Sequence, residues 1–328
     1  MLVEPQPVQL GQCRRPVVHE EPRVAHRPAI CRDRHRCATL TAMIAAALIA
    51  SLPSPPSNAI HIGPLQLRAY GLSIALGVIA AVWIAQRRWA QRGGDPSDIS
   101  RLALWSVLAG IAGARLYHVI TDHQRFDGRW LHAFAVWEGG LGIPGGLVAG
   151  VLTGVVVARR RGLPVAQLLD VVAPAIPVAQ AIGRLGNWFN QELFGRPTQL
   201  PWGLRIDPEN RPRGFEDVAI YHPTFLYEAL WNLALAGLLL LYERRRPGAA
   251  PGRLFALYVG GYALGRLWVE ALRIDPASRI AGVRVNIWVS IVTLAITVAW
   301  LVATRHRSGP ANPGPSSTPT GETVPRSS

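Results

Sequence analysis

Long apolar stretches separated by short polar ones run along most of this chain. A helix needs about 20 mostly apolar residues to cross a bilayer core of about 30 Å. The fourth such stretch contains Asp170, Pro174 and Pro177, which makes it the least regular and a candidate for a break. We expect an all-α fold, that of a polytopic membrane protein. The pattern predicts about seven transmembrane helices, at residues 69–89, 99–120, 140–158, 165–183, 223–242, 253–272 and 286–304.

The composition agrees with a membrane protein. Of the 328 residues, 49% are hydrophobic and only 16% are charged, whereas soluble domains average about a quarter charged residues. The net charge is +14, and all 34 basic residues are arginines. Such a charge is typical of proteins that bind nucleic acid or a membrane surface. The arginines gather between apolar stretches, at residues 87–92, 159–161 and 244–246, so we expect a membrane and no nucleic acid partner.

The orientation follows from these arginines. The three arginine-rich segments are alternate loops of the predicted topology, so they share one side of the membrane. The positive-inside rule assigns that side to the cytoplasm. We therefore expect an N-out, C-in arrangement, in which the loops at 121–139, 184–222 and 273–285 face outward.

The two ends of the chain differ from its middle. Residues 1–42 are polar and rich in arginine, and Cys13, Cys31 and Cys37 match no zinc or redox spacing. Because these arginines conflict with an outward-facing start, we expect residues 1–42 to be disordered or to precede a natural start at Met43. Residues 43–306 then form a single membrane domain, and residues 307–328 a disordered cytoplasmic tail rich in Pro, Ser, Thr and Gly.

The densest polar cluster at membrane depth lies at residues 183–202. Glycines let backbone N–H groups approach an anion, and arginine matches a phosphate with two parallel hydrogen bonds. An anion site and a solvated re-entrant loop are both open interpretations. The polar side chains concerned are Arg184, Asn187, Asn190, Gln191, Glu192 and Arg196.

A second cluster lies in the sixth predicted helix. Tyr262, Arg266 and Glu270 are spaced by four residues, which places them along one helix face. They could form a neutralising Arg266–Glu270 ion pair and nothing more. The other interpretation is that part of the Arg266 fork stays free and forms, with Arg184, a two-pronged phosphate clamp.

Two further groups are ambiguous from spacing alone. His222, Tyr227 and Glu228 precede or begin the fifth helix, and His222 could be only an interfacial residue. Tyr70, at the start of the first helix, could belong to an interfacial aromatic belt or donate to a lipid headgroup. The small-residue spacing of residues 146, 150 and 154 indicates close packing against a neighbouring helix.

Together these segments resemble the prolipoprotein diacylglyceryl transferase family. The resemblance covers about residues 61–300, in order, and is most specific in the 183–204 segment. The matching pieces are HIGPLQLRAYGLSIALG (61–77), WEGGLGIPGG (137–146), GRLGNWFNQELFGRPTQLPWGL (183–204), HPTFLYEAL (222–230) and GYALGRLWVEALR (261–273).

The resemblance implies a seven-helix transferase of the bacterial plasma membrane. Its substrates would be phosphatidylglycerol, among the membrane lipids, and a prolipoprotein signal peptide with its lipobox cysteine. The enzyme would move the diacylglyceryl group to the cysteine thiol, with formation of a thioether and release of glycerol phosphate. The resemblance assigns catalytic or binding roles to Arg184, Asn187, Glu192, Gly195, Arg266, Tyr262, Glu270 and Tyr70.

One departure from the family pattern concerns the base. The family often has a histidine where this chain has Pro144, and proline cannot accept a proton. A free thiol has a pKa of about 8.5 and needs a base or a positive field to ionise. Glu270 and Glu192 are our candidate bases, with His222 behind them, while Arg184 and Arg266 stabilise the leaving phosphate.

The chemistry requires no metal and no cofactor, and we expect neither. Two alternatives from other functional classes stay open at this point. A transporter would use a broken helix with a polar centre. A noncatalytic scaffold would use the same arginines only to hold a phospholipid.

Overall fold

The computed structural model describes residues 51–62, 65–126, 128–135 and 139–305, which belong to the unit formed by residues 48–328. The predicted N-terminal extension (1–42) and C-terminal tail (307–328) lie outside the described residues. The predicted domain limits and the start at Met43 therefore stay predictions.

Helices cover all seven predicted stretches. The sixth has the predicted limits, and the fourth is divided in two. The prediction of an all-α, polytopic membrane protein is confirmed. Within the described residues the helices are α2 (Ala69–Ala90), α3 (Pro96–Thr121), α4 (Ile143–Arg160), α5 (Val165–Val172), α6 (Ala175–Phe189), α7 (Thr224–Arg245), α8 (Arg253–Leu272) and α9 (Val285–Ala303).

The number of membrane spans is less settled than the number of helices. In the described part of the chain, five helices are long and apolar enough to span a membrane. The bent pair of α5 and α6 could add a sixth, and α8 is not among them. Seven spans and the N-out, C-in orientation therefore stay predictions.

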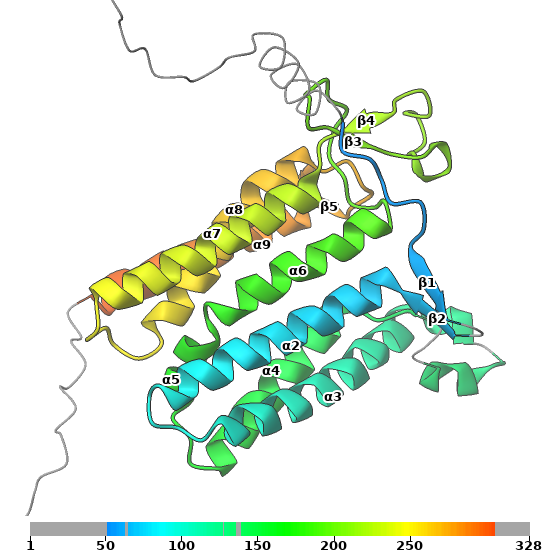
Figure 1. Ribbon diagram of the computed structural model, residues 1–328. Coiled ribbons are helices and arrows are strands. Elements are labelled where there is room, and N and C mark those ends of the chain that lie inside the picture. Colours follow the sequence, from blue (N-terminus) through cyan, green and yellow to red (C-terminus); the bar gives the residue numbers. More distant parts are fainter. Residues whose placement is uncertain (1–50, 63–64, 127, 136–138, 306–328) are drawn as a thin grey trace, which may run out of the picture. The chain divides into compact units, whose positions relative to one another are not determined.

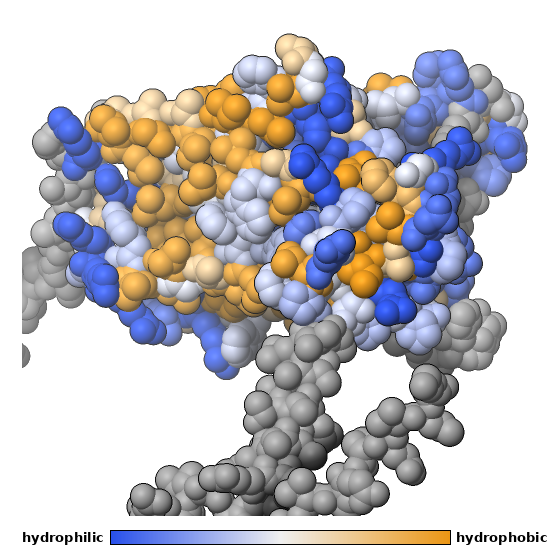
Figure 2. Space-filling model, turned by 90° about the horizontal axis from the view of Figure 1, so that it is seen from above, coloured by the Kyte–Doolittle hydropathy of each residue, from blue (hydrophilic) through white to orange (hydrophobic). Residues whose placement is uncertain are grey.

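The helices pack in three groups, which Figure 1 shows side by side. Helices α2 and α6 pack on each other in the middle, α3 and α4 pair on one side, and α7, α8 and α9 lie on the other. Figure 2 shows a broad hydrophobic area on one face, with hydrophilic side chains gathered towards its ends. Large side chains such as Ile79, Leu238 and Ile296 are exposed on the helices, as expected of surfaces that face lipid.

Three short hairpins, which the hydrophobic pattern did not predict, lie in the loops at one end of the helices. We call this the hairpin end; α2, α7 and α9 begin there, and α3, α6 and α8 end there. A further loop at this end connects α3 to α4 and contains the 3₁₀-helices η1 (His123–Phe126) and η2 (Trp130–Phe134). The antiparallel strand pairs are β1 (Ala59–Ile62) with β2 (Leu65–Arg68), β3 (Leu204–Arg205) with β4 (Ile220–Tyr221), and β5 (Arg279–Ile280) with β6 (Val283–Arg284).

A cluster of buried side chains fixes the β3–β4 hairpin to the start of α7. Leu204, Ile206 and Tyr221 are almost fully buried and pack with Phe194 and Phe225. The hairpin therefore ties the loop that follows α6 to the first turn of α7.

The predicted close packing at residues 146, 150 and 154 is confirmed between α4 and α3. A Cβ atom at Gly146 would lie 3.1 Å from the carbonyl oxygen of Gly110, and one at Gly150 would lie 3.1 Å from that of Ser106. Only glycine permits the two backbones to approach this closely without strain.

The fourth predicted helix is broken, and its second half is bent by 42° relative to the first. Pro174 has no N–H to donate to the carbonyl of Asp170, and its ring crowds the preceding turn. Arg88 of α2 compensates, since its Nε donates to the carbonyl of Val171 at 2.9 Å and its Nη2 to that of Asp170 at 3.2 Å. The break is therefore supported by a side chain from another helix.

The Asp170 side chain caps the first turn of α8. Its Oδ2 accepts from the N–H of Gly252 at 2.7 Å, and its Oδ1 from that of Phe255 at 2.9 Å. These N–H groups have no acceptor within the helix, and a carboxylate also interacts favourably with the positive end of the helix dipole.

Replacement of this carboxylate should destabilise the protein. We expect Asp170→Ala to lower the free energy of unfolding by about 1–3 kcal/mol, because two charge-assisted bonds to α8 are lost. Thermal unfolding of purified protein in detergent measures the effect, with Asp217→Ala, at an exposed loop residue, as the control. An equal midpoint for both variants would contradict the proposed cap.

Candidate active site

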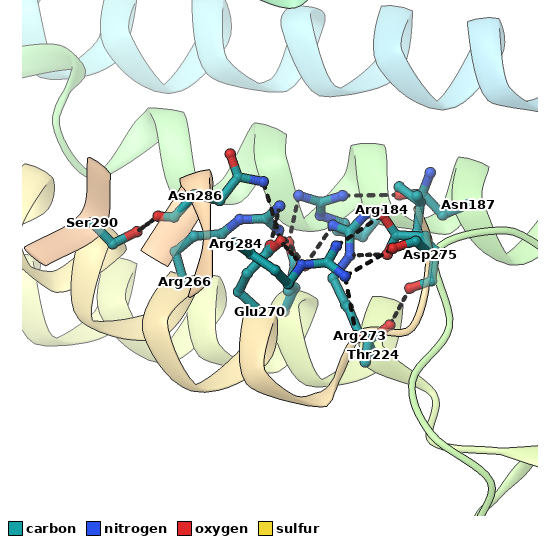
Figure 3. A network of polar contacts seen from close by, with 12 residues as sticks. Arg184, Asn187, Thr224, Arg266, Glu270, Arg273, Asp275, Arg284, Asn286 and Ser290 are labelled. Carbon is teal, nitrogen blue, oxygen red and sulfur yellow. Dashed lines mark hydrogen bonds and ion pairs between the residues drawn. The ribbon is translucent and has the colours of Figure 1, made fainter. Parts of the chain in front are cut away.

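Four arginines and three carboxylates meet at the hairpin end of α6, α7 and α8 (Figure 3). We call these seven residues the arginine network. They come from four separate segments, because α6, α7, α8 and the α8–α9 loop converge here. The members are Arg184, Arg266, Arg273, Arg284, Glu228, Glu270 and Asp275.

Glu228 of α7 bridges two of these arginines. Its Oε2 forms an ion pair with Nη2 of Arg184, and its Oε1 accepts from Nη1 of Arg266 at 2.9 Å. Nη1 of Arg273 lies 3.9 Å from the same Oε1. The two arginines predicted to form a clamp therefore converge on one buried carboxylate.

Glu270 of α8 is fully buried, with 0% of its surface exposed. Its Oε2 lies 2.7 Å from Nη2 of Arg266, which confirms the predicted ion pair. Its Oε1 accepts from Nε of Arg284 at 2.5 Å and from Nδ2 of Asn286 at 3.2 Å. The other Nη group of Arg266 donates to Glu228, a contact that helix spacing did not predict.

Asp275, in the loop after α8, completes the network. Its Oδ1 accepts from Nε of Arg273 at 2.7 Å, and its Oδ2 from Nη2 of Arg284 at 3.0 Å. Burial alone would raise the pKa of Asp275, but the hydrogen bonds and charges of the two arginines outweigh it and hold the pKa below its usual value. Burial alone would lower the pKa of Arg273, but its hydrogen bond to Asp275 and the charges of Asp275, Glu270 and Glu228 raise it.

A chain of amides connects Arg184 to Glu192. Nη1 of Arg184 donates to Oδ1 of Asn187 at 3.1 Å, and Nδ2 of Asn187 donates to Oε1 of Glu192 at 2.8 Å. Nδ2 of Asn190 donates to the same oxygen at 3.3 Å. Three residues singled out in the 183–202 segment are thus linked to the arginine network, and Glu192 is partly exposed.

Tyr70 and Tyr262 approach the network from α2 and α8. A Cβ atom at Gly186 would lie 2.7 Å from the Tyr70 ring, so this glycine lets the ring pack against α6. Tyr262, with Glu228 and Arg266, lines a cavity of about 10 Å³, which is about the size of one water molecule.

His222 and Gly195 lie beside the network and form no ion pair with it. Nδ1 of His222 lies 3.1 Å from the Tyr227 hydroxyl, which also accepts from the Trp202 indole at 3.0 Å. Burial, with a contribution from the charge of Arg196, lowers the pKa of His222, so its ring is neutral at pH 7. The N–H of Gly195 donates to the carbonyl of His222 at 2.9 Å, which fixes the two segments together.

Two residues of the 183–202 cluster point to other partners. Nη2 of Arg196 donates to the carbonyl of Ala271 at 2.9 Å, and Nε2 of Gln191 donates to Asp207 at 2.6 Å. Pro144 occupies the first turn of α4, a position that tolerates proline.

Comparison with known proteins identifies the family. Residues 57–303 match the family model described as prolipoprotein diacylglyceryl transferase. This chain belongs to the prolipoprotein diacylglyceryl transferase family. It is 50% identical over 262 residues to phosphatidylglycerol–prolipoprotein diacylglyceryl transferase 2 of Streptomyces coelicolor, which covers 79% of this chain and 82% of that protein. The transferase of the same name from Cutibacterium acnes is 48% identical over 262 residues, or 79% of this chain and 88% of that protein.

Sequence reasoning missed three members of this transferase's network, Arg273, Asp275 and Arg284, and also Asn286, which donates to Glu270. All four lie in or next to a loop that the predicted topology places outside the membrane, where charges are usually solvated. Glu228 lies in the segment that matches the family, but its spacing gave no sign that it bridges two other helices. One hint was available from the sequence, because charges inside a predicted membrane helix, such as Arg266 and Glu270, need partners.

The shifted pKa of Asp275 predicts a pH-dependent contribution to stability. Because the folded-state pKa lies below the unfolded value of about 3.9, the contribution is complete above that value and is lost as the pH falls through the folded pKa. We expect Asp275→Asn to be less stable than the wild type at pH 7, and the difference to narrow at more acidic pH. Thermal unfolding between pH 7 and pH 3 measures this, and a constant difference would contradict it.

Proposed function

We propose that this chain transfers the diacylglyceryl group of phosphatidylglycerol to the thiol of the lipobox cysteine in a prolipoprotein signal peptide. The proposed location is the bacterial plasma membrane, with the hairpin end facing outward. Family membership supports a transferase over a transporter or a noncatalytic scaffold. The observation that carries the proposal is the convergence of Arg184 and Arg266 on the single carboxylate of Glu228.

The charge of the arginine network favours a phosphate diester as the ligand. In this network four guanidinium groups face three carboxylates, so the seven residues carry a formal net charge of +1. Phosphatidylglycerol carries one negative charge on its phosphate. We propose that this phosphate binds between Arg184 and Arg266 and displaces part of the Glu228 contacts, since guanidinium groups bind carboxylate and phosphate with the same geometry.

In the proposed reaction, the substrate thiolate attacks the glycerol carbon that bears the phosphate. The new C–S bond forms as the C–O bond breaks, and the electron pair stays on the phosphate oxygen of the departing glycerol phosphate. Negative charge therefore grows on the phosphate, where Arg184 and Arg266 stabilise it more strongly than in the bound lipid.

The two candidate bases have different surroundings. Glu270 is fully buried between Arg266 and Arg284, which stabilises its charged form and leaves it no access to a substrate thiol. Glu192 is partly exposed, and its side-chain hydrogen bonds within the described residues come from the neutral amides of Asn187 and Asn190. We therefore propose Glu192 as the base and Glu270 as a residue that positions Arg266.

The phosphate role predicts large losses on replacement of either arginine. In vesicles that contain phosphatidylglycerol and a lipobox peptide, mass spectrometry follows the gain of a diacylglyceryl group on the peptide. We expect Arg184→Gln and Arg266→Gln each to lower the rate at least about a hundredfold, as loss of a donor to a developing anion does. Arg205→Gln, at an exposed residue of β3, is the matched control. Wild-type rates in both network variants would refute the phosphate site.

The base role predicts a change in the pH profile. In Glu192→Gln the thiol has to ionise without help, so the rate should rise with pH up to about 8.5, the pKa of a free thiol. The wild-type rate should depend much less on pH over the same range. Glu270→Gln serves as the comparison, because a positioning role predicts a lower rate with an unchanged profile. Identical profiles for Glu192→Gln and the wild type would assign the base to another group.

A further inference from the structure

The polar lining of the small cavity beside Glu228 continues one helical turn further along α7. Asn232 follows Glu228 by four residues, so the two side chains lie on one face of the helix. Helical side chains lean towards the N-terminus of their helix, which directs the Asn232 amide towards the turn that carries Glu228. Both residues line the cavity together with Tyr262 and Arg266 of α8.

Asn232 is the buried amide of this cavity, with only 2% of its surface exposed. In the part of the chain that the structure describes, its side chain forms no hydrogen bond, and neither does the Tyr262 hydroxyl. Burial of an amide without a partner destabilises a protein. The next buried residues along α7 are apolar, namely Leu235, Ala236 and Leu239. Packing alone therefore does not account for an asparagine at this position.

The indole of Trp231 also lines the cavity, but its donor is already used. Its Nε1 donates to the carbonyl of Gly261 at 3.0 Å. A Cβ atom at Gly265 would lie 2.1 Å from the same nitrogen, so this glycine lets the indole lie against α8. Among the described lining residues, Asn232 and Tyr262 are therefore the neutral donors that have no acceptor.

Glu228 is the carboxylate in the lining of this cavity. Its two oxygens contact Arg184 and Arg266, the same guanidinium groups for which the proposed phosphate competes. A carboxylate oxygen that loses its cation inside a protein needs other donors. The cavity of about 10 Å³ has room for one oxygen atom or one water molecule. It therefore offers both the space and the donors for a displaced carboxylate oxygen.

We propose that Asn232 is a positioning residue of the transferase. Its amide, together with the Tyr262 hydroxyl, receives the carboxylate of Glu228 when a phosphate displaces it from the arginines. Glu228 turns about its side-chain bonds into the cavity and returns when the glycerol phosphate leaves. Asn232 itself does not contact the substrate. This inference rests on the proposed function, because it describes where Glu228 goes when the phosphate binds.

Steady-state kinetics of the full chain test the proposal, in vesicles that contain phosphatidylglycerol at different mole fractions and a lipobox peptide. Asn232→Leu keeps the size of the side chain but removes the donor. We expect the KM for phosphatidylglycerol to rise about tenfold with an almost unchanged kcat, because the lost bond stabilises the bound lipid and the transition state equally. Asn232→Ser retains a donor and should raise the KM less.

Thermal unfolding separates this role from a structural one. Asn232→Leu should not lower the Tm of the lipid-free protein, since the amide has no described partner there. The control is Leu235→Ala, which removes buried apolar packing in the next turn of α7. It should lower the Tm and leave the KM at the wild-type value. A lower Tm or kcat of Asn232→Leu at an unchanged KM would overturn the proposal.

Binding of tritiated phosphatidylglycerol to the full chain in detergent micelles, without peptide, gives a second readout. Asn232→Leu should raise the Kd about tenfold, but it should have little effect in the Glu228→Gln background, where no charged carboxylate is displaced. An unchanged Kd, or the same increase in both backgrounds, would overturn the role of Asn232. A wild-type protein that binds the lipid but never modifies the peptide would instead refute the proposed function, and the Kd values would still decide this inference.

Discussion

The buried carboxylate of Glu228 needs a cation beside it, because a buried carboxylate without one costs several kcal/mol. Arg184 and Arg266 meet this need, and they come from the helices on either side of α7. The three helices are therefore held in one register at the hairpin end. Loss of one partner from such a buried pair typically costs about 3–5 kcal/mol, so this contact constrains the fold as well as the site.

The same constraint explains how a dense group of charges persists in an apolar surrounding. Carboxylates hold the four guanidinium groups oriented and close together in the absence of substrate. The phosphate that we propose as ligand would then meet donors that are already in place and need little reorganisation. The hairpins and the cluster around Tyr221 hold the loops that supply these donors.

The sequence predicted the helices well because their apolar stretches are long, and even the break at Pro174 followed from local chemistry. The hairpins escaped prediction because strands of two to four residues have too little alternation to detect. The predicted role of Arg266 shows the limit most clearly. Its pairing with Glu270 follows from helix spacing, but its pairing with Glu228 depends on how two helices pack. The contacts of Arg273 and Arg284 could not be predicted either, because they also depend on how separate segments pack.

The Asp170 contacts have a consequence for the surrounding bilayer. Asp170 fixes the backbone N–H groups where α8 begins, and the arginine network fixes the polar groups towards the other end of α8. The 20 residues of α8 correspond to about 30 Å of helix, close to the thickness of a hydrocarbon core. With both ends fixed, the helix cannot slide along its axis to match a thinner or thicker membrane. If α8 crosses the membrane, as the sequence predicts, the surrounding lipids have to adapt their thickness to this helix.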